Sequence, residues 1–180
     1  MKRREIKKHI TGYLLGGFVF LILIPFVIYL ISLMPSASLG SSLPHIRFIN
    51  YSAAALLSLA GAVFAIWSNI DLLIAGKGGP ADFFNKPISP RSKRLVTGGP
   101  YRYTRNPMVF GMNALYIALS IFLNSLSALL FCLLFLSAVI LYLRQTEEKR
   151  LIRDFGDEYL KYKNSVSMII PFPPKKDMET

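Results

Sequence analysis

Cysteine and histidine are almost missing from this sequence. Its 180 residues include one cysteine, Cys132, and two histidines, His9 and His45. A single cysteine cannot form an internal disulfide, and so few ligands cannot assemble a His/Cys metal cluster. We therefore predict no resident metal. The counts leave a site made of carboxylates alone open, and no residue pattern suggests one.

Charged residues are absent from three long stretches of the chain. These uncharged runs are Ile10–Met34, Phe48–Ile70 and Pro107–Leu143, which contain 25, 23 and 37 residues. A bilayer core of roughly 30 Å needs about 20 apolar residues in a helix. The first two runs therefore predict one membrane crossing each.

The third run is too long for one crossing, because a helix of its length would measure about 55 Å. Its natural break is the polar pair Asn124-Ser125, which has the chemistry of a turn. We expect a helical hairpin with arms Met108–Leu123 and Leu126–Leu143. The first arm is about 24 Å long, so it either crosses the membrane or lies partly submerged against its neighbours. The fold class is an all-α integral membrane protein of about four transmembrane helices.

Acidic residues are scarce beside basic ones, at 10 against 21, which gives a net charge of +11. Strongly basic chains often bind nucleic acid. Here the distribution argues for a membrane instead, because Arg47 alone falls in the connector Pro35–Arg47 and four crossings place 20 of the 21 cations on one face. This positive-inside pattern predicts that both termini are cytosolic, and we expect the cell membrane as the location. We predict no nucleic-acid partner.

The N-terminus has a basic segment before its first apolar run, as a signal peptide does. A signal peptide has an apolar region of 7–15 residues, whereas Ile10–Met34 is longer. An uncleaved first helix is the better interpretation, with cleavage as the alternative. We expect Trp67 to lie at the membrane interface, near the end of the second helix. Asn69 and Asp71 lie just beyond Trp67, where they are expected to be a solvated helix end or, as the alternative, to contact a polar substrate head.

A Gly-, Pro- and Lys-rich loop follows at Ala75–Arg105. Its Gly76-Lys77-Gly78-Gly79 lacks the spacing of a nucleotide P-loop. It leads into LVTGGPYRYTRNPM at Leu95–Met108, where Pro107 suits the first helical position. On composition alone, the tyrosines and arginines of this segment are an interfacial belt.

The segment after Leu143 continues as an amphipathic helix. Glu147, Leu151 and Phe155 recur every four residues, and Tyr159 and Tyr162 extend the stripe, which predicts an inward-facing surface. Gly156-Asp157 predicts a kink. The Pro-rich end PFPPKKDMET is expected to be a frayed tail.

These two segments together resemble the isoprenylcysteine carboxyl methyltransferase and phospholipid methyltransferase superfamily of membrane enzymes. Members have patterns similar to L-V-x-x-G-P-Y-R-Y-x-R-[HN]-P-M-Y, a helical hairpin, and E-E-x-x-L-x-x-x-F-G-x-E-Y-x-x-Y. The likeness extends from about Gly76 to Pro174. We therefore divide the chain into 1–75 (two N-terminal helices), 76–174 (the methyltransferase-like region) and 175–180 (tail).

The resemblance implies an S-adenosyl-L-methionine site on the cytosolic side, under the C-terminal helices. The family's cofactor positions fall on Leu95, Val96, Tyr101, Asn106, Pro107, Met108 and Glu147. Arg144 is the candidate for holding an acceptor carboxylate. An amine or phenol acceptor needs a base, for which Glu148 or water is the candidate; otherwise Glu148 is a solvated surface charge. Asn106 replaces the histidine of the carboxyl methyltransferases and Val109 replaces a tyrosine.

The resemblance implies a methyltransferase that acts on a lipophilic small molecule or a membrane lipid, by carboxylate O-methylation or amine N-methylation. Two alternatives belong to other classes: an NADPH-dependent membrane reductase, and a non-catalytic scaffold whose site has decayed. The acceptor and the oligomeric state are open at this stage.

Overall fold

The computed structural model describes residues 3–34, 47–76, 82–83, 86–87, 92 and 94–173, with the backbone alone at 3–9, 82–83 and 86–87. Several sequence predictions fall outside these residues. They concern the body of the connector 35–46, the glycines at 78–79 and the tail at 175–180.

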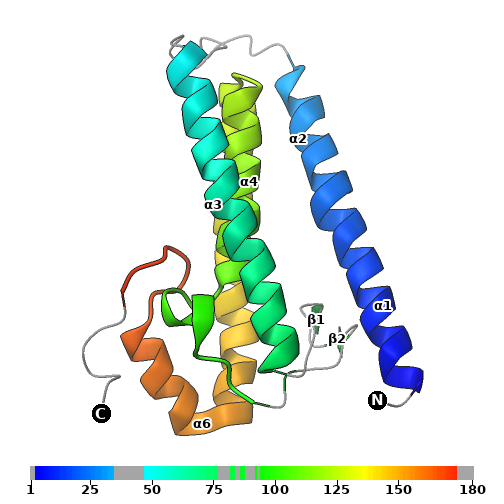
Figure 1. Ribbon diagram of the computed structural model, residues 1–180, viewed down its shortest axis with the longest axis vertical. Coiled ribbons are helices and arrows are strands. Elements are labelled where there is room, and N and C mark those ends of the chain that lie inside the picture. Colours follow the sequence, from blue (N-terminus) through cyan, green and yellow to red (C-terminus); the bar gives the residue numbers. More distant parts are fainter. Residues whose placement is uncertain are drawn as a thin grey trace.

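Within the described residues the protein is a bundle of helices (Figure 1). In chain order the elements are α1 (Arg3–Gly17), η1 (Phe18–Leu23), α2 (Ile24–Ser32), α3 (Arg47–Ile74), β1 (Asp82–Phe83), β2 (Lys86–Pro87), η2 (Gly99–Arg102), α4 (Pro107–Phe122), α5 (Leu126–Tyr142), η3 (Leu143–Glu147) and α6 (Glu148–Ser165). The two strands form one short antiparallel pair. The all-α prediction is confirmed.

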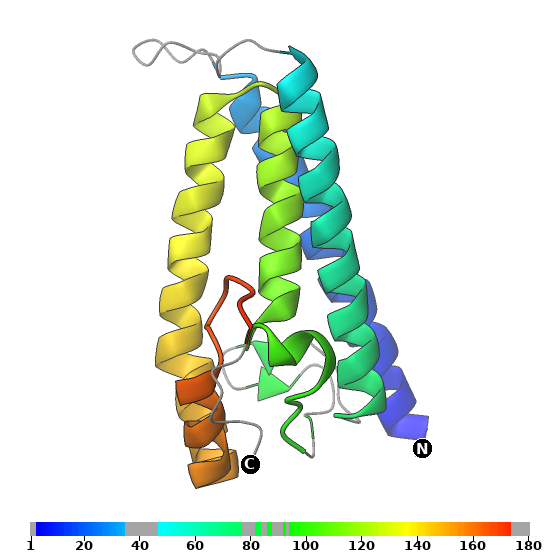
Figure 2. The same cartoon turned by 60° about the vertical axis from the view of Figure 1, so that its left-hand side comes forward.

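The bundle has two distinct ends (Figures 1 and 2). The turn between α4 and α5 lies at one end, which we call the hairpin end; η2, α6 and the start of α1 lie at the other, which we call the site end. The segments Ile10–Ser32, Arg47–Ile74 and Leu126–Ser165 are long and apolar enough to cross a membrane, and α4 is a shorter apolar helix. Large apolar side chains on the outside, such as Leu14, Phe48 and Leu134, are 70%, 81% and 71% exposed. This is an integral membrane protein whose outer surface suits lipid.

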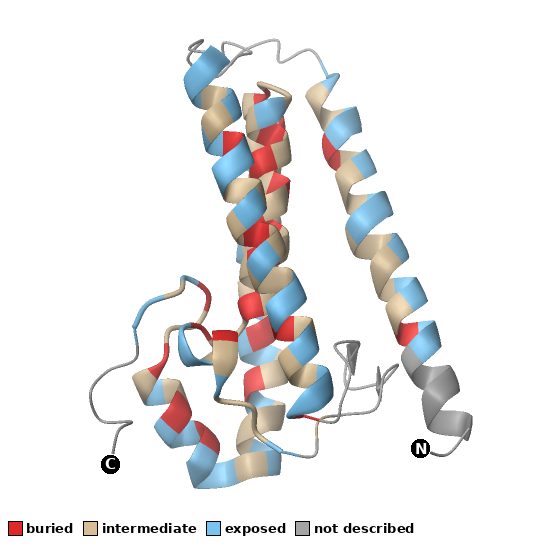
Figure 3. Cartoon of the chain, viewed as in Figure 1, coloured by how far each residue is buried: buried red, intermediate tan, exposed pale blue. Residues whose placement is uncertain are grey.

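Burial is concentrated on α4 (Figure 3), where Asn113, Ala114, Tyr116, Ala118 and Ser120 are buried. Small residues let α3 and α4 approach closely. A Cβ on Gly111 would lie 2.6 Å from the nitrogen of Ala65 and from the carbonyl oxygen of Gly61. The α3–α4 pair is therefore held by backbone-to-backbone packing, which a membrane interior favours because lipid supplies no hydrophobic drive between helices.

The predicted break between the hairpin arms is confirmed. Asn124 has a φ of 50°, and the Ser125 side chain caps α5 by accepting a hydrogen bond from the backbone N–H of Ala128. Pro107 is the first residue of α4, as expected. The second apolar helix runs further than its uncharged stretch, to Ile74, so Asn69 and Asp71 lie in the last turns of α3.

The first rod, α1–η1–α2, contains a widened π-helical stretch at Phe18–Leu23 just before Pro25. Proline lacks a donor and disturbs the helical ladder around it. The Tyr116 hydroxyl donates a 2.8 Å hydrogen bond to the carbonyl of Phe20 in this stretch, which ties the first rod to α4.

Candidate functional site

The turn η2 is fixed against the last turns of α3. Gly99 has a φ of 54°, and a Cβ there would lie 1.6 Å from Oδ2 of Asp71 and 3.1 Å from Nε1 of Trp67. Glycine is favoured there because the backbone is left-handed, and any side chain would have to displace Asp71. Asp71 is therefore packed against the turn that carries Tyr101, in place of the solvated helix end that the sequence suggested.

A segment that follows α6, which we call the C-terminal strap (Val166–Phe172), lies against the loop before α4. The Arg105 N–H donates to the carbonyl of Ser167 at 2.9 Å, and the Phe172 N–H donates to the carbonyl of Tyr103 at 3.0 Å. Nδ2 of Asn106 and the hydroxyl of Thr104 both donate to the carbonyl of Met168, at 3.0 and 3.1 Å. The predicted frayed tail at PFPP is therefore wrong at its first residues, since Phe172 is paired with the loop.

The helix α6 turns its aromatic side chains toward this loop. Gly156 has φ 54° and ψ −130°, which confirms the predicted kink. Beyond it, Tyr159 and Tyr162 are buried in a cluster with Val166, and the Tyr162 hydroxyl donates to the carbonyl of Tyr101 at 2.7 Å. The kink thus folds the end of α6 back over the η2 turn.

These elements enclose a cavity of about 190 Å³ at the site end. All seven predicted cofactor residues line it: Leu95, Val96, Tyr101, Asn106, Pro107, Met108 and Glu147. The rest of the predicted stripe, Leu151, Phe155, Tyr159 and Tyr162, lines it as well. The two sequence segments, Leu95–Met108 and Glu147–Tyr162, are about forty residues apart along the chain, and both line this one cavity.

Two adjacent glutamates take different directions at η3. This stretch is a π-helix, in which the N–H of Glu148 bonds to the carbonyl of Leu143 five residues earlier. Glu147 lines the cavity and forms an ion pair with Arg150, with 3.0 Å between the guanidinium nitrogen and the carboxylate oxygen. Glu148 is 6% exposed and pairs with Arg105 and, at 2.7 Å, with Lys163. The interpretation of Glu148 as a solvated surface charge is wrong.

The two residues predicted to act on the acceptor do not line the cavity. Arg144 is exposed on η3, and Glu148 faces its two cations. Arg105 and Arg150 line the cavity instead; Arg105 was expected only in the interfacial belt, and Arg150 had been given no role. Arg150 had a local signal, because it lies one helical turn after Glu147. Arg105 had the weaker signal of standing inside the tyrosine- and arginine-rich motif.

Tyr101 sits in the wall of the cavity with its hydroxyl kept protonated. Burial raises the pKa of this phenol above its ordinary value, and the negative charges of Glu147 and then Asp71 raise that pKa further. A phenol in this state donates hydrogen bonds and does not serve as a base. An aromatic ring in a cavity wall can attract a cation through its face.

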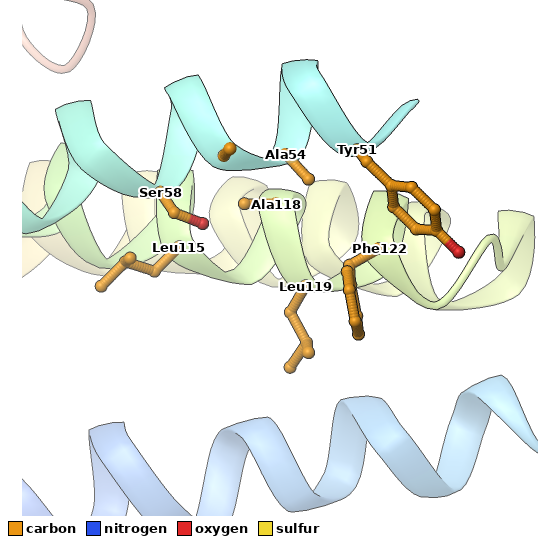
Figure 4. Close-up of a pocket in the computed structure, with 8 residues that line it drawn as sticks. Tyr51, Ala54, Ser58, Leu115, Ala118, Leu119 and Phe122 are labelled. Carbon is orange, nitrogen blue, oxygen red and sulfur yellow. The ribbon is translucent and has the colours of Figure 1, made fainter. Parts of the chain in front are cut away.

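A second cavity, of about 370 Å³, opens between α3 and α4 in the hairpin half (Figure 4). The Tyr51 and Phe122 rings lie 5.7 Å apart at its end, and Ala54 and Ala118 leave the space between the helices. It has no charged residue in its lining. The cavity at the site end is therefore the candidate for chemistry on a polar group.

The fold and this cavity define the class of the protein. It is a helical membrane protein with a pocket of aromatic and charged side chains at one end of its bundle. The phospholipid methyltransferase family model matches residues 49–158, more than half of the chain. The chain belongs to this family, and its activity is of the family's class, methyl transfer to a membrane-lipid-related acceptor. No curated protein and no solved structure matches the chain.

Proposed function

We propose that this protein is an S-adenosyl-L-methionine-dependent methyltransferase that acts on a lipophilic or membrane-embedded acceptor, with its pocket on the cytosolic face. The observation that carries the proposal is the convergence of Tyr101, Asn106–Met108 and Glu147 on one cavity. The cofactor would enter from the cytosol, and the acceptor from the bilayer.

The chemistry of the cavity lining fits this cofactor. Leu95, Val96 and Met108 give apolar walls for a base, and Glu147 suits an ammonium group or ribose hydroxyls. Arg150 is a bidentate partner for a carboxylate, and we assign it the anion-holding role first given to Arg144. Pockets for small molecules usually measure about 300–1,000 Å³, and this cavity measures about 190 Å³. We therefore expect part of the bound cofactor to extend out of the mouth of the cavity.

The cofactor supplies a methyl group on a sulfonium, and the protein needs no covalent intermediate. Alignment of the two reactants can supply roughly 7–11 kcal/mol of the barrier reduction. The Tyr101 ring stabilises a cation by about 0.5–2 kcal/mol. Because Glu148 is buried between two cations outside the cavity, we propose that it positions Arg105 and does not act as the base. A carboxylate acceptor needs no base, whereas for an amine Glu147 or water takes the proton.

Titration calorimetry of detergent-purified protein with S-adenosylhomocysteine tests the site. Glu147→Ala removes a charge-assisted hydrogen bond, so we expect roughly 10–100-fold weaker binding. Tyr101→Ala should weaken it roughly 2–30-fold. The matched control is Arg144→Ala, which is exposed and outside the lining, and should bind as the wild type does. Unchanged affinity in both cavity variants would refute the site.

The reaction is tested by mass spectrometry of lipids and small molecules after incubation with deuterated-methyl cofactor. The expected product is a lipophilic compound heavier by one labelled methyl group. If NADPH raises the melting temperature and S-adenosylhomocysteine does not, the chain is a reductase. If neither binds and no label is incorporated, it is a scaffold.

A further inference from the structure

The helix α4 stops well short of its partner at the site end. Gly61 and Gly111 are in contact, so they lie at the same level in the two antiparallel helices. From there α3 continues to Ile74, about 20 Å, whereas α4 reaches its first residue, Pro107, after about 6 Å. At about 24 Å overall, α4 is shorter than a hydrocarbon core of about 30 Å. A core of that thickness would extend about 6 Å beyond α4.

The loop before α4 and the C-terminal strap lie at the foot of α4. Figures 1 and 2 show the strap rising from α6 toward the foot of α4. Non-helical backbone is tolerated at membrane depth where protein groups satisfy it. The strap and loop satisfy one another in this way, through the bonds from Arg105 to Ser167, from Phe172 to Tyr103, and from Thr104 and Asn106 to Met168.

Two large apolar side chains of the strap are exposed. Ile169 is 8% exposed, but Ile170 and Phe172 are 60% and 56% exposed. The strap contains no charged residue, whereas the exposed Lys161 stands just before it on α6. Exposed apolar side chains close to a cation suit the boundary between acyl chains and anionic headgroups.

We propose that the strap is a re-entrant segment that inserts into the same leaflet as the foot of α4 and faces lipid through Ile170 and Phe172. Its partner is the bilayer itself, at the acyl–headgroup boundary. The strap completes the crossing that α4 begins, and it holds the wall of the site-end cavity at membrane depth. The inference rests on the membrane placement of the helices and not on the identity of the cofactor.

Spin-label accessibility in proteoliposomes tests this placement. In a Cys132→Ala background, labels are placed by Ile170→Cys and Phe172→Cys. The lipid reference is Leu134→Cys on α5, and the water reference is Glu158→Cys, an exposed position beyond the kink. We expect oxygen to relax the strap labels more than a water-soluble nickel complex does, as at position 134, with the opposite order at position 158.

Each outcome decides the proposal. If the strap labels follow the water reference, the strap lies outside the membrane and the proposal fails. If both reagents are excluded and labels on two copies broaden one another, the surface is an interface between copies, and the proposal fails again. The unmodified chain gives a second measurement, in liposomes that contain a phospholipid with a photoreactive acyl chain. Adducts should map to Ile170–Phe172 as well as to α5, and adducts on α5 alone would overturn the proposal.

Discussion

Two regions of this molecule are held together by different physics. In the helical bundle, α3 and α4 meet through Gly61, Ala65 and Gly111, and the contact is backbone against backbone. At the site end, the η2 turn, the strap and α6 are joined by hydrogen bonds and by the ion cluster around Glu148. The α3–α4 contact depends on the absence of side chains, and the site end depends on particular side chains. Substitutions in the two regions should therefore have different effects.

The largest effect should come from removing the charge at the centre of the site end. Glu148→Ala leaves Arg105 and Lys163 without their shared carboxylate, and Arg105 is only 10% exposed. Breaking a buried ion pair from one side costs about 3–5 kcal/mol. We expect a matching loss in the free energy of unfolding, measured by titrating the detergent-purified protein with a denaturing detergent. Binding of S-adenosylhomocysteine should weaken as well, because Arg105 lines the cavity.

The control for this prediction is Glu158→Ala on the same helix. Glu158 is exposed, and surface substitutions usually change stability by within about 0.5 kcal/mol. Equal losses for the two variants would mean that the cluster contributes nothing beyond a surface charge.

A smaller effect should follow from filling the contact between α3 and α4. The added methyl group of Gly111→Ala would lie 2.6 Å from the Gly61 carbonyl and the Ala65 nitrogen, so the helices must move apart. Overpacking of this kind costs about 1–3 kcal/mol. Gly16→Ala is the matched control, since no atom lies within 4 Å of the new methyl group. A thermal-shift assay in detergent should show a lower melting temperature for Gly111→Ala and an unchanged melting temperature for Gly16→Ala.

Local sequence rules predicted the elements well. The uncharged runs marked the apolar helices, Pro107 and Ser125 marked two helix starts, and Gly156 marked the kink. Each of these signals acts within a few residues of its position. The inward stripe from Glu147 to Tyr162 was also predictable, because it needs only a helical period.

The arrangement at the site end was less accessible to such rules. The strap bonds join residues more than sixty positions apart, such as Asn106 and Met168, and no periodicity encodes such a pairing. The direction of Glu148 was missed because its partners, Arg105 and Lys163, lie 43 and 15 residues away along the chain, and a helical period does not encode such pairs. Arg144 was favoured by its position before the acidic pair, but it is exposed and lies outside the cavity lining.

The smallest effect is expected at the hairpin turn, which belongs to neither of the two regions compared above. Ser125→Ala removes the oxygen that accepts from the Ala128 N–H at 3.2 Å, a cap normally worth about 1 kcal/mol. Ser125 is 6% exposed, so water does not readily replace the lost acceptor, and the melting temperature should fall slightly. Ser137→Ala is the control, because this exposed serine does not cap a helix. Its hydroxyl donates a hydrogen bond to the Leu133 carbonyl within the same helix. Because the turn lies at the opposite end from the cavity, affinity for S-adenosylhomocysteine should stay at the wild-type value. Lower affinity in Ser125→Ala would mean that the hairpin sets the position of α6, and that the two ends are not independent.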